Sequence, residues 1–518
     1  MTTDAPPQYS ADGHWWWTGT EWVPAQSQQP AAPVQLPITA SMEILPTSYV
    51  PTPRNGPGIL KSALVGGAAA VVLLGGGTAF AVNHYLGGGG QQPEDVLPAN
   101  AVGVVKLDLD PSLGQKKALY DLSRKFPSVH AKGAGSIKDD LLGAMFTSSS
   151  MNYAHDVKPW LGDRVAIAAV PDKSATGFAP VAAVQYTDKG KATKTLRLAA
   201  IRATSDNKFA FAFSGDYVVI ATTQAAADRY AKTTSHLSDN ASYKSAVASL
   251  DGDQIAVAWA DLKGLYDAIP KAQLKTNPFF AGTRTNAHPT GAVVVGAHAS
   301  SNYLEVVGKA VDAGDSLSQL GGQTFGKAST GNLIASFPDD TAAAFEVAGL
   351  GPALAAMYKS SPALKGVAST AAKFGFRLPD DISTVLGTDT AVGLTGDLRQ
   401  SSPSFVARVR TANPDRAVSV LTRVASAGEA PPFEVSKEAG GYLLASDSDG
   451  LTAMKTGHLG QSASFRRALP DAKGAAMAVY VRFSGLPIPS TPDLMNLDAF
   501  GMTVDPAAGG FRMRLTVH

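Results

Sequence analysis

Three clusters of acidic residues are the first candidates for chemistry, because carboxylates are ligands that calcium prefers. They are Asp339-Asp340, Asp380-Asp381 and the run Asp447-Ser448-Asp449-Gly450. The last run resembles the start of a calcium-binding loop, but the twelfth position, which needs a bidentate Glu, is His458 here. Asp also favours turns and helix N-caps. We therefore expect turn and capping roles and no metal site.

A second candidate is the run Trp160-Leu161-Gly162-Asp163-Arg164. In a functional interpretation, its Asp-Arg pair binds a ligand. In a structural interpretation, the Trp fills a core, the Gly makes a turn and the charged pair caps the start of a strand. A related stretch keeps Leu386-Gly387 but neither the Trp nor the Asp-Arg pair, which favours the structural interpretation.

Common catalytic signatures are missing from the sequence, which contains no HExxH, P-loop, GxGxxG or GxSxG motif. The chain has no Cys, which excludes Cys nucleophiles, iron–sulfur clusters and Cys-based zinc sites, and its His residues lack metal-ligand spacing. We therefore assign no catalytic, cofactor-binding or metal residue and expect a protein that is not an enzyme. A hydrolase built on a Ser or Asp placed by the fold is the enzymatic alternative.

Length and charge set further bounds. The chain has 518 residues, more than one core supports, so we expect several domains. Its 44 basic and 43 acidic residues nearly balance, and no strong basic tract occurs. This composition argues against nucleic acid as a partner.

The elements that would position a site are arranged about one apolar stretch, Ser62 to Val82, which contains no charge. At ~1.5 Å per residue, a helix of this length spans about 30 Å, the thickness of a bilayer's hydrocarbon core. Arg54 and Lys61 precede it, and no Lys or Arg follows until Lys106. Positive charge marks the cytoplasmic side, so we predict a single-pass cell-membrane protein with its N-terminus in the cytoplasm.

Two features of this stretch have alternative interpretations. Ala79-Phe80-Ala81 has the small-x-small pattern of a signal-peptide cleavage site, although about 60 residues precede the stretch. Ser62, Gly66 and Ala70 repeat at four-residue spacing, as in helix-dimer faces. Because Gly and Ala are so frequent here, this spacing also arises by chance.

A Trp-rich segment precedes the membrane stretch. Trp15, Trp16, Trp17 and Trp22 flank a short Thr-Gly-Thr turn, which predicts a β-hairpin with Trp rings packed across its strands. These rings either form a contact surface for a protein or the membrane, or only hold the hairpin together. The segment resembles the short Trp-Asp-Gly-x-x-Trp hairpin of many actinobacterial membrane proteins, with Thr18 in the Asp place.

Composition divides the chain into six parts. Pro-, Gln- and Gly-rich stretches flank the apolar segment and are typical of extended tethers. The predicted parts are a cytoplasmic hairpin (1–24), a linker (25–58), a transmembrane helix (59–85), a Gly-rich linker (86–96) and two ectodomain repeats (97–328 and 329–518).

The two repeats are predicted from matching stretches in the same order. The stretches beginning at Leu97, Trp160, Gly215 and Ala241 match those beginning at Phe337, Val385, Gly440 and Ala463. Each half shows strands joined by tight turns, with helices in clusters, which favours an antiparallel α+β fold. We expect two such sheets to lie side by side and form one curved surface.

LPANAVGVVKLDLDP, KKALYDLSRKFP and VKPWLGDRVAIA resemble an actinobacterial membrane family known as domain of unknown function three-three-five-two. The resemblance runs from about Leu97 to the C-terminus. It implies an envelope location and a single span, and it supplies no activity or catalytic residue.

These observations predict a membrane-anchored envelope protein whose duplicated ectodomain binds a partner or serves as a scaffold. The expected partners are the membrane and either an envelope protein or a lipid. A carrier or sensor for an apolar ligand is the alternative, since curved sheets covered by helices often enclose apolar cavities.

Overall fold

The computed structural model describes residues 15–17 and 22–24 and most of residues 90–518. Within the second range the gaps are 109–111, 128–138, 140–151, 175, 204–207, 271–286, 317–330, 361–365, 367, 374, 400–402, 428–430 and 506–508.

The chain divides into two compact units, and the first contains the expected hairpin. Strand β1 (Trp15–Trp17) pairs antiparallel with β2 (Trp22–Pro24), and Trp17 lies opposite Trp22. The packing of the Trp rings lies outside what is described, as do the predicted membrane stretch and its helix-dimer face of Ser62, Gly66 and Ala70. Among the described helices, none has the length and apolar character needed to cross a bilayer.

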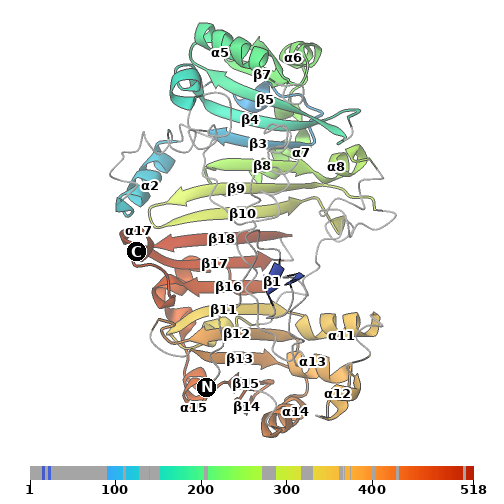
Figure 1. Ribbon diagram of the computed structural model, residues 1–518, viewed down its shortest axis with the longest axis vertical. Coiled ribbons are helices and arrows are strands. Elements are labelled where there is room, and N and C mark those ends of the chain that lie inside the picture. Colours follow the sequence, from blue (N-terminus) through green and yellow to red (C-terminus); the bar gives the residue numbers. More distant parts are fainter. Residues whose placement is uncertain are drawn as a thin grey trace. The chain divides into compact units, whose positions relative to one another are not determined.

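The second unit is built on one antiparallel sheet of sixteen strands (Figure 1). Its first eight strands are β3 (Gly103–Asp108), β4 (Leu161–Pro171), β5 (Phe178–Tyr186), β6 (Ala210–Ser214), β7 (Tyr217–Ala221), β8 (Ala256–Asp261), β9 (Ala292–Ser300) and β10 (Tyr303–Val311). The other eight are β11 (Thr341–Ala348), β12 (Asp389–Thr395), β13 (Ser404–Arg410), β14 (Glu434–Glu438), β15 (Gly441–Ala445), β16 (Met477–Arg482), β17 (Leu497–Asp505) and β18 (Gly510–Val517).

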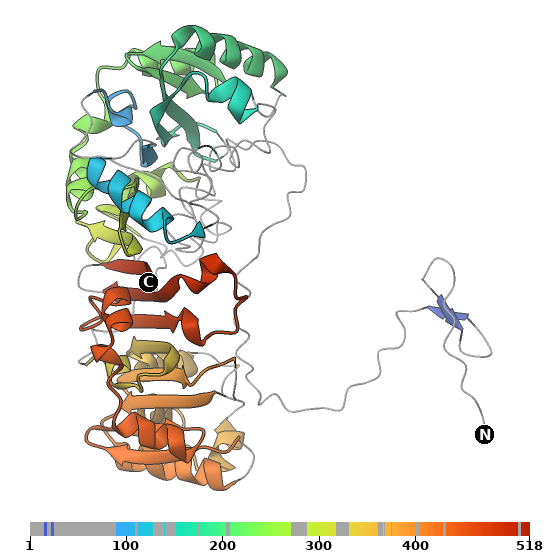
Figure 2. The ribbon, with the colours of Figure 1, turned by 90° about the vertical axis from the view of Figure 1, so that its left-hand side faces the viewer.

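The two sets of eight strands have the same order when read outward from the centre. One half runs β10-β9-β8-β3-β4-β5-β7-β6 and the other β18-β17-β16-β11-β12-β13-β15-β14. The halves join because their last strands pair, from Tyr303 opposite Thr516 to Gly308 opposite Phe511. The C-terminus therefore lies mid-sheet (Figure 2). The antiparallel α+β prediction is confirmed, and the two expected sheets are one continuous sheet. The domain boundaries remain predictions.

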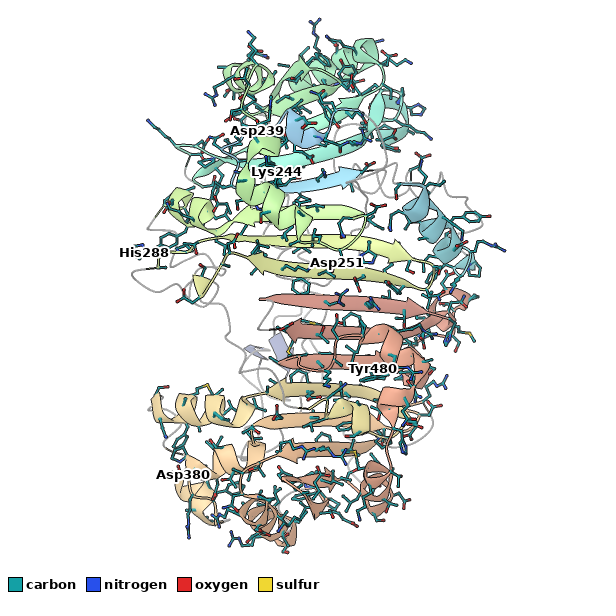
Figure 3. All side chains as sticks on the ribbon, turned by 180° about the vertical axis from the view of Figure 1, so that it is seen from behind. Asp239, Lys244, Asp251, His288, Asp380 and Tyr480 are labelled. Carbon is teal, nitrogen blue, oxygen red and sulfur yellow. The ribbon has the colours of Figure 1, made fainter. Side chains whose placement is uncertain are left out.

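Helices cover both faces of the sheet. We call the face seen in Figure 1 the front face and the opposite face, seen in Figure 3, the back face. The back face carries α6 (Gln224–Ala231), α7 (Ala241–Ala248), α15 (Ser448–Lys455) and α16 (Ala463–Ala468). The front face carries α2 (Leu113–Ser123), α5 (Lys189–Arg202), α8 (Leu262–Ala268), α13 (Asp380–Leu386) and α14 (Pro414–Ser426), with α11 (Leu350–Ser360) against α13. Two further helices are α12 (Ala368–Lys373) and α17 (Pro492–Met495).

The back-face cores of the two halves are built alike. In the first half, the ring of Tyr243 on α7 meets Trp259 of β8 edge-on, with centroids 5.5 Å apart. In the second, Phe465 on α16 meets Tyr480 of β16 at 5.3 Å, and Figure 3 shows Tyr480 on this face. Such aromatic pairs stabilise a core beyond their buried area. The matching stretches that begin at Ala241 and Ala463 thus occupy equivalent places.

Candidate binding surface

The central strands present apolar side chains on the front face and charged ones on the back. In β18, Phe511, Met513 and Leu515 alternate with Arg512 and Arg514. Side chains in a strand alternate between the two faces, and Arg514 lies opposite the buried Glu305 of β10. The arginines therefore point to the back, and the three apolar side chains point to the front.

The same arrangement continues across seven neighbouring strands, from β10 through β18, β17, β16, β11 and β12 to β13. At the paired front positions of these strands, Thr390 is the one polar residue. The larger apolar residues there that are not fully buried, which we call the apolar front patch, are Leu304, Val306, Phe345, Val392, Leu394, Phe405, Met477, Val479, Val481, Phe500, Met502, Val504, Phe511, Met513 and Leu515.

The apolar front patch is not fully buried. Phe345 and Phe405 are 37% and 40% exposed, and the other members are half-buried. At ~4.8 Å between neighbouring strands, seven strands extend over about 29 Å. Contiguous apolar surface of this extent commonly marks a binding site.

Described helices border this patch. On one side, α2 packs with Ala118 and Leu119 against Ala299 and Leu304. On the other, α14 packs with Ala417 and Leu421 against Val409 of β13. Figure 1 shows β18, β17 and β16 between these helices.

Behind the patch, the back face holds a buried ion cluster across the β10–β18 pair. Glu305, whose side chain is 1% exposed, accepts from Nη1 of Arg512 (2.6 Å) and from Nε of Arg514. Nε2 of His298 lies 3.6 Å from the same carboxylate. Burial lowers the pKa of His298, so this imidazole is neutral at neutral pH. Arg512 also pairs with Asp471 at 2.6 Å.

A second buried carboxylate lies beside this cluster. Asp498 accepts from Nη2 of Arg467 and Oγ of Ser464, both at 2.6 Å, and from Oγ1 of Thr516 at 3.1 Å. Burial favours the neutral acid, but hydrogen bonds from Ser464 and Arg467 outweigh it and lower the pKa of Asp498. Each carboxylate is thus satisfied by a guanidinium, which indicates a structural role at the junction of the halves.

The Trp160 motif serves the core. Trp160 is buried, and its Nε1 donates to the carbonyl oxygen of Asp156 at 2.7 Å. Arg164, with a 10% exposed side chain, pairs with the buried Asp108 at 3.2 Å, and the backbone amide of Asp163 donates to Oε1 of Gln185. The prediction of a turn at Gly162 is wrong, because Gly162 lies within β4, at the point where the register of β4 against β5 shifts.

Two of the three acidic clusters act through their carboxylates, one as a helix cap and one in an ion pair. Asp447 is the N-cap of α15 and accepts from the amide of Gly450 at 2.7 Å, as expected. Asp381 pairs with Arg416 at 2.5 Å. Asp339 and Asp340 offer their backbone carbonyls to Arg482. Within the described ranges, no group of three or more His, Cys, Asp or Glu is placed to hold a metal.

Sequence reasoning missed the apolar front patch. Its signal is present in strands such as Gly510–Val517, where apolar and basic residues alternate. Such alternation is usually read with the apolar side facing a core and the basic side facing water. Only the pairing of Arg512 and Arg514 with Glu305 reveals that the basic side is the more enclosed one.

Comparison with known proteins gives a family without an activity. No curated protein matches the chain significantly. Among solved structures, a crystal structure of TP0453 is 8% identical, covers 43% of this chain and 82% of its own, and has a TM-score of 0.20, too low to carry an argument. A family model described as protein of unknown function matches residues 63–439. This match ends between β14 and β15, whereas the resemblance in the sequence was expected to continue to the C-terminus. Because this match covers well over half of the sequence, the chain belongs to the DUF3352 family.

Proposed function

We propose that this protein is a membrane-anchored, extracytoplasmic binding protein and that the apolar front patch is its binding surface. The observation that supports this proposal is the partly exposed apolar patch across seven strands, backed by the buried ion pairs of Glu305 with Arg512 and Arg514. Leaving so many large apolar side chains in contact with water costs free energy, at about 25 cal/mol per Å². A ligand that covers them recovers that free energy.

The chemistry of the patch favours the acyl chains of a lipid as its ligand. Protein–protein interfaces usually carry about one hydrogen bond per 100–200 Å². The front positions of β10, β18, β17 and β16 offer no side-chain donor or acceptor in their paired stretches. A surface of this kind suits a ligand that needs no directional contacts, and the expected membrane anchor holds the protein where lipids are abundant.

Native mass spectrometry of the full chain, extracted from its membrane in mild detergent, tests this proposal. We expect lipids to co-purify with the wild-type chain. The variants Phe345→Glu and Met513→Glu place a charge in the patch and should lose them, because burying an unpaired carboxylate against acyl chains is costly.

Met357→Glu is the matched control, since Met357 on α11 is 50% exposed outside the patch. This variant should retain the lipid, and circular dichroism should show all three variants folded. A wild-type chain without any bound apolar molecule, or equal lipid content in all variants, would contradict the proposal. A co-purifying protein lost only from the patch variants would point to a scaffold instead.

A further inference from the structure

Helix α5 presents an unusual surface to solvent. It carries five basic residues and no acidic one: Lys189, Lys191, Lys194, Arg197 and Arg202. All five are exposed, together with Leu198 (45%) and Ile201 (80%). Its buried side consists of Ala192, Leu196 and Ala199, which face the sheet.

The exposed apolar and basic residues share one stripe. Residues three or four apart in a helix lie on the same side. Lys194, Arg197 and Ile201 follow this spacing, and Leu198 lies next to them. Apolar side chains set among basic ones on a helix are typical of contact with an anionic membrane surface, where the cations meet headgroup phosphates and the apolar groups enter the interface.

The duplicated fold supplies an internal comparison in α14. Both helices have side-chain N-caps: Asp188 accepts from the amide of Lys191 in α5, and Asn413 accepts from the amide of Arg416 in α14. Counting from the caps, Ser426 takes the place of Ile201. Helix α14 carries one acidic and two basic residues. The basic and apolar stripe is therefore not needed to build this helix in this fold.

The start of α5 lies near Gln91, close to the first described residue of this part of the chain. Gln91 accepts hydrogen bonds from the amide of Asp216 (3.0 Å) and from the hydroxyl of Tyr217 (2.9 Å) in the β6–β7 hairpin. On the neighbouring strand of the same hairpin, the ring of Phe213 lies 4.8 Å from Nζ of Lys189. From Val82, the predicted end of the membrane helix, to Gln91 is nine residues, which span at most about 30 Å.

We infer that α5 docks on the outer surface of the bilayer and binds its anionic lipid headgroups. This inference rests on the proposed membrane anchor, but not on lipid binding by the apolar front patch. Since α5 packs on the front face of the sheet, docking turns that face toward the bilayer.

A single fluorescent label tests the inference, because the chain contains no Cys that would compete for it. The full chain carrying Ile201→Cys is labelled and placed in nanodiscs of phosphatidylcholine alone or mixed with phosphatidylglycerol, each containing a lipid-bound quencher. Ser426→Cys is the matched control at the equivalent place on α14. We expect strong quenching only for the label at position 201, only with phosphatidylglycerol, and weaker quenching at high salt.

Neutralising Lys194 and Arg197 in the labelled chain, with Lys194→Gln and Arg197→Gln, separates docking from mere proximity. Each lost charge should lower the ratio of docked to undocked chains about fivefold, which corresponds to about 1 kcal/mol. Equal quenching at positions 201 and 426 would overturn the inference but not the proposed membrane anchor. The same holds for quenching that is unchanged by phosphatidylglycerol and by both Gln variants. A chain that does not co-purify with nanodiscs at all overturns the anchor and the inference together.

Discussion

Replacing Glu305 by Ala should destabilise the protein more than any exposed ion-pair change. Glu305 sits at the junction of the two halves, where its carboxylate is the shared partner of Arg512 and Arg514. Its side chain is 1% exposed, and those of the two arginines are 23% and 15% exposed. The variant removes the anion and leaves two guanidinium groups enclosed without it.

The expected cost follows from this enclosure. Breaking a buried ion pair by removing one partner typically costs about 3–5 kcal/mol, because the remaining charge loses its compensation. We expect a loss in this range from Glu305→Ala. Asp415→Ala is the control, because Asp415 and Lys437 form an ion pair with 75% and 51% exposed side chains, and exposed pairs contribute about 0–1 kcal/mol.

Urea unfolding of the full chain, followed by circular dichroism, measures both variants against the wild type. We expect a clearly lower midpoint for Glu305→Ala and an almost unchanged one for Asp415→Ala. If the two variants lose the same small amount of free energy, the junction of the halves does not depend on this ion cluster, and the structural role assigned to it is wrong.

Three further predictions concern other residues. Burial lowers the pKa of His298. The stabilising contribution of this neutral imidazole is therefore complete above about pH 6.5 and is lost as the pH falls below that value. His298→Gln should lose less stability than the wild type on acidification, and urea midpoints that are equal for both proteins at each pH would contradict this. Asp447→Ala should lower the free energy of unfolding by about 1 kcal/mol through loss of the α15 cap, whereas Asp447→Asn, which keeps a cap, should lose less in the same thermal melt. Gly393→Ala should cost about 1–3 kcal/mol, because its Cβ would lie 2.8 Å from the ring of Phe337. Gly331→Ala, whose Cβ would meet no atom of the described residues within 4 Å, should melt like the wild type.

Local structure and the internal repeat were readable from the sequence because both depend on short-range patterns. Asn413 before Pro414 predicts the start of α14, and Asn413 does accept from the amide of Arg416. Ser112, a residue type that favours N-caps, directly precedes α2, and its side chain accepts from the amide of Gln115. The matching stretches at Gly215 and Gly440 both form tight turns, with φ values of 53° and 72°.

The candidate binding surface was not readable because it depends on which side of each strand is enclosed. Period-two alternation in β18 shows that two different sides exist, but not which one faces a core. That choice is made by long-range pairing: Glu305 is over 200 residues from Arg514 in the chain. The pairing of β10 with β18 also joins the two halves into one sheet. The sequence pattern of each half, taken alone, does not indicate this pairing.

Photocrosslinking directly tests whether the apolar front patch binds lipid. The full chain would be reconstituted with phospholipids that carry a photoreactive group near the end of an acyl chain, irradiated, and analysed by peptide mass spectrometry. We expect adducts on β16, β17 and β18, at front residues such as Val479, Met502 and Met513, in addition to adducts in the membrane stretch. Adducts confined to the membrane stretch, with none on these strands, would contradict it.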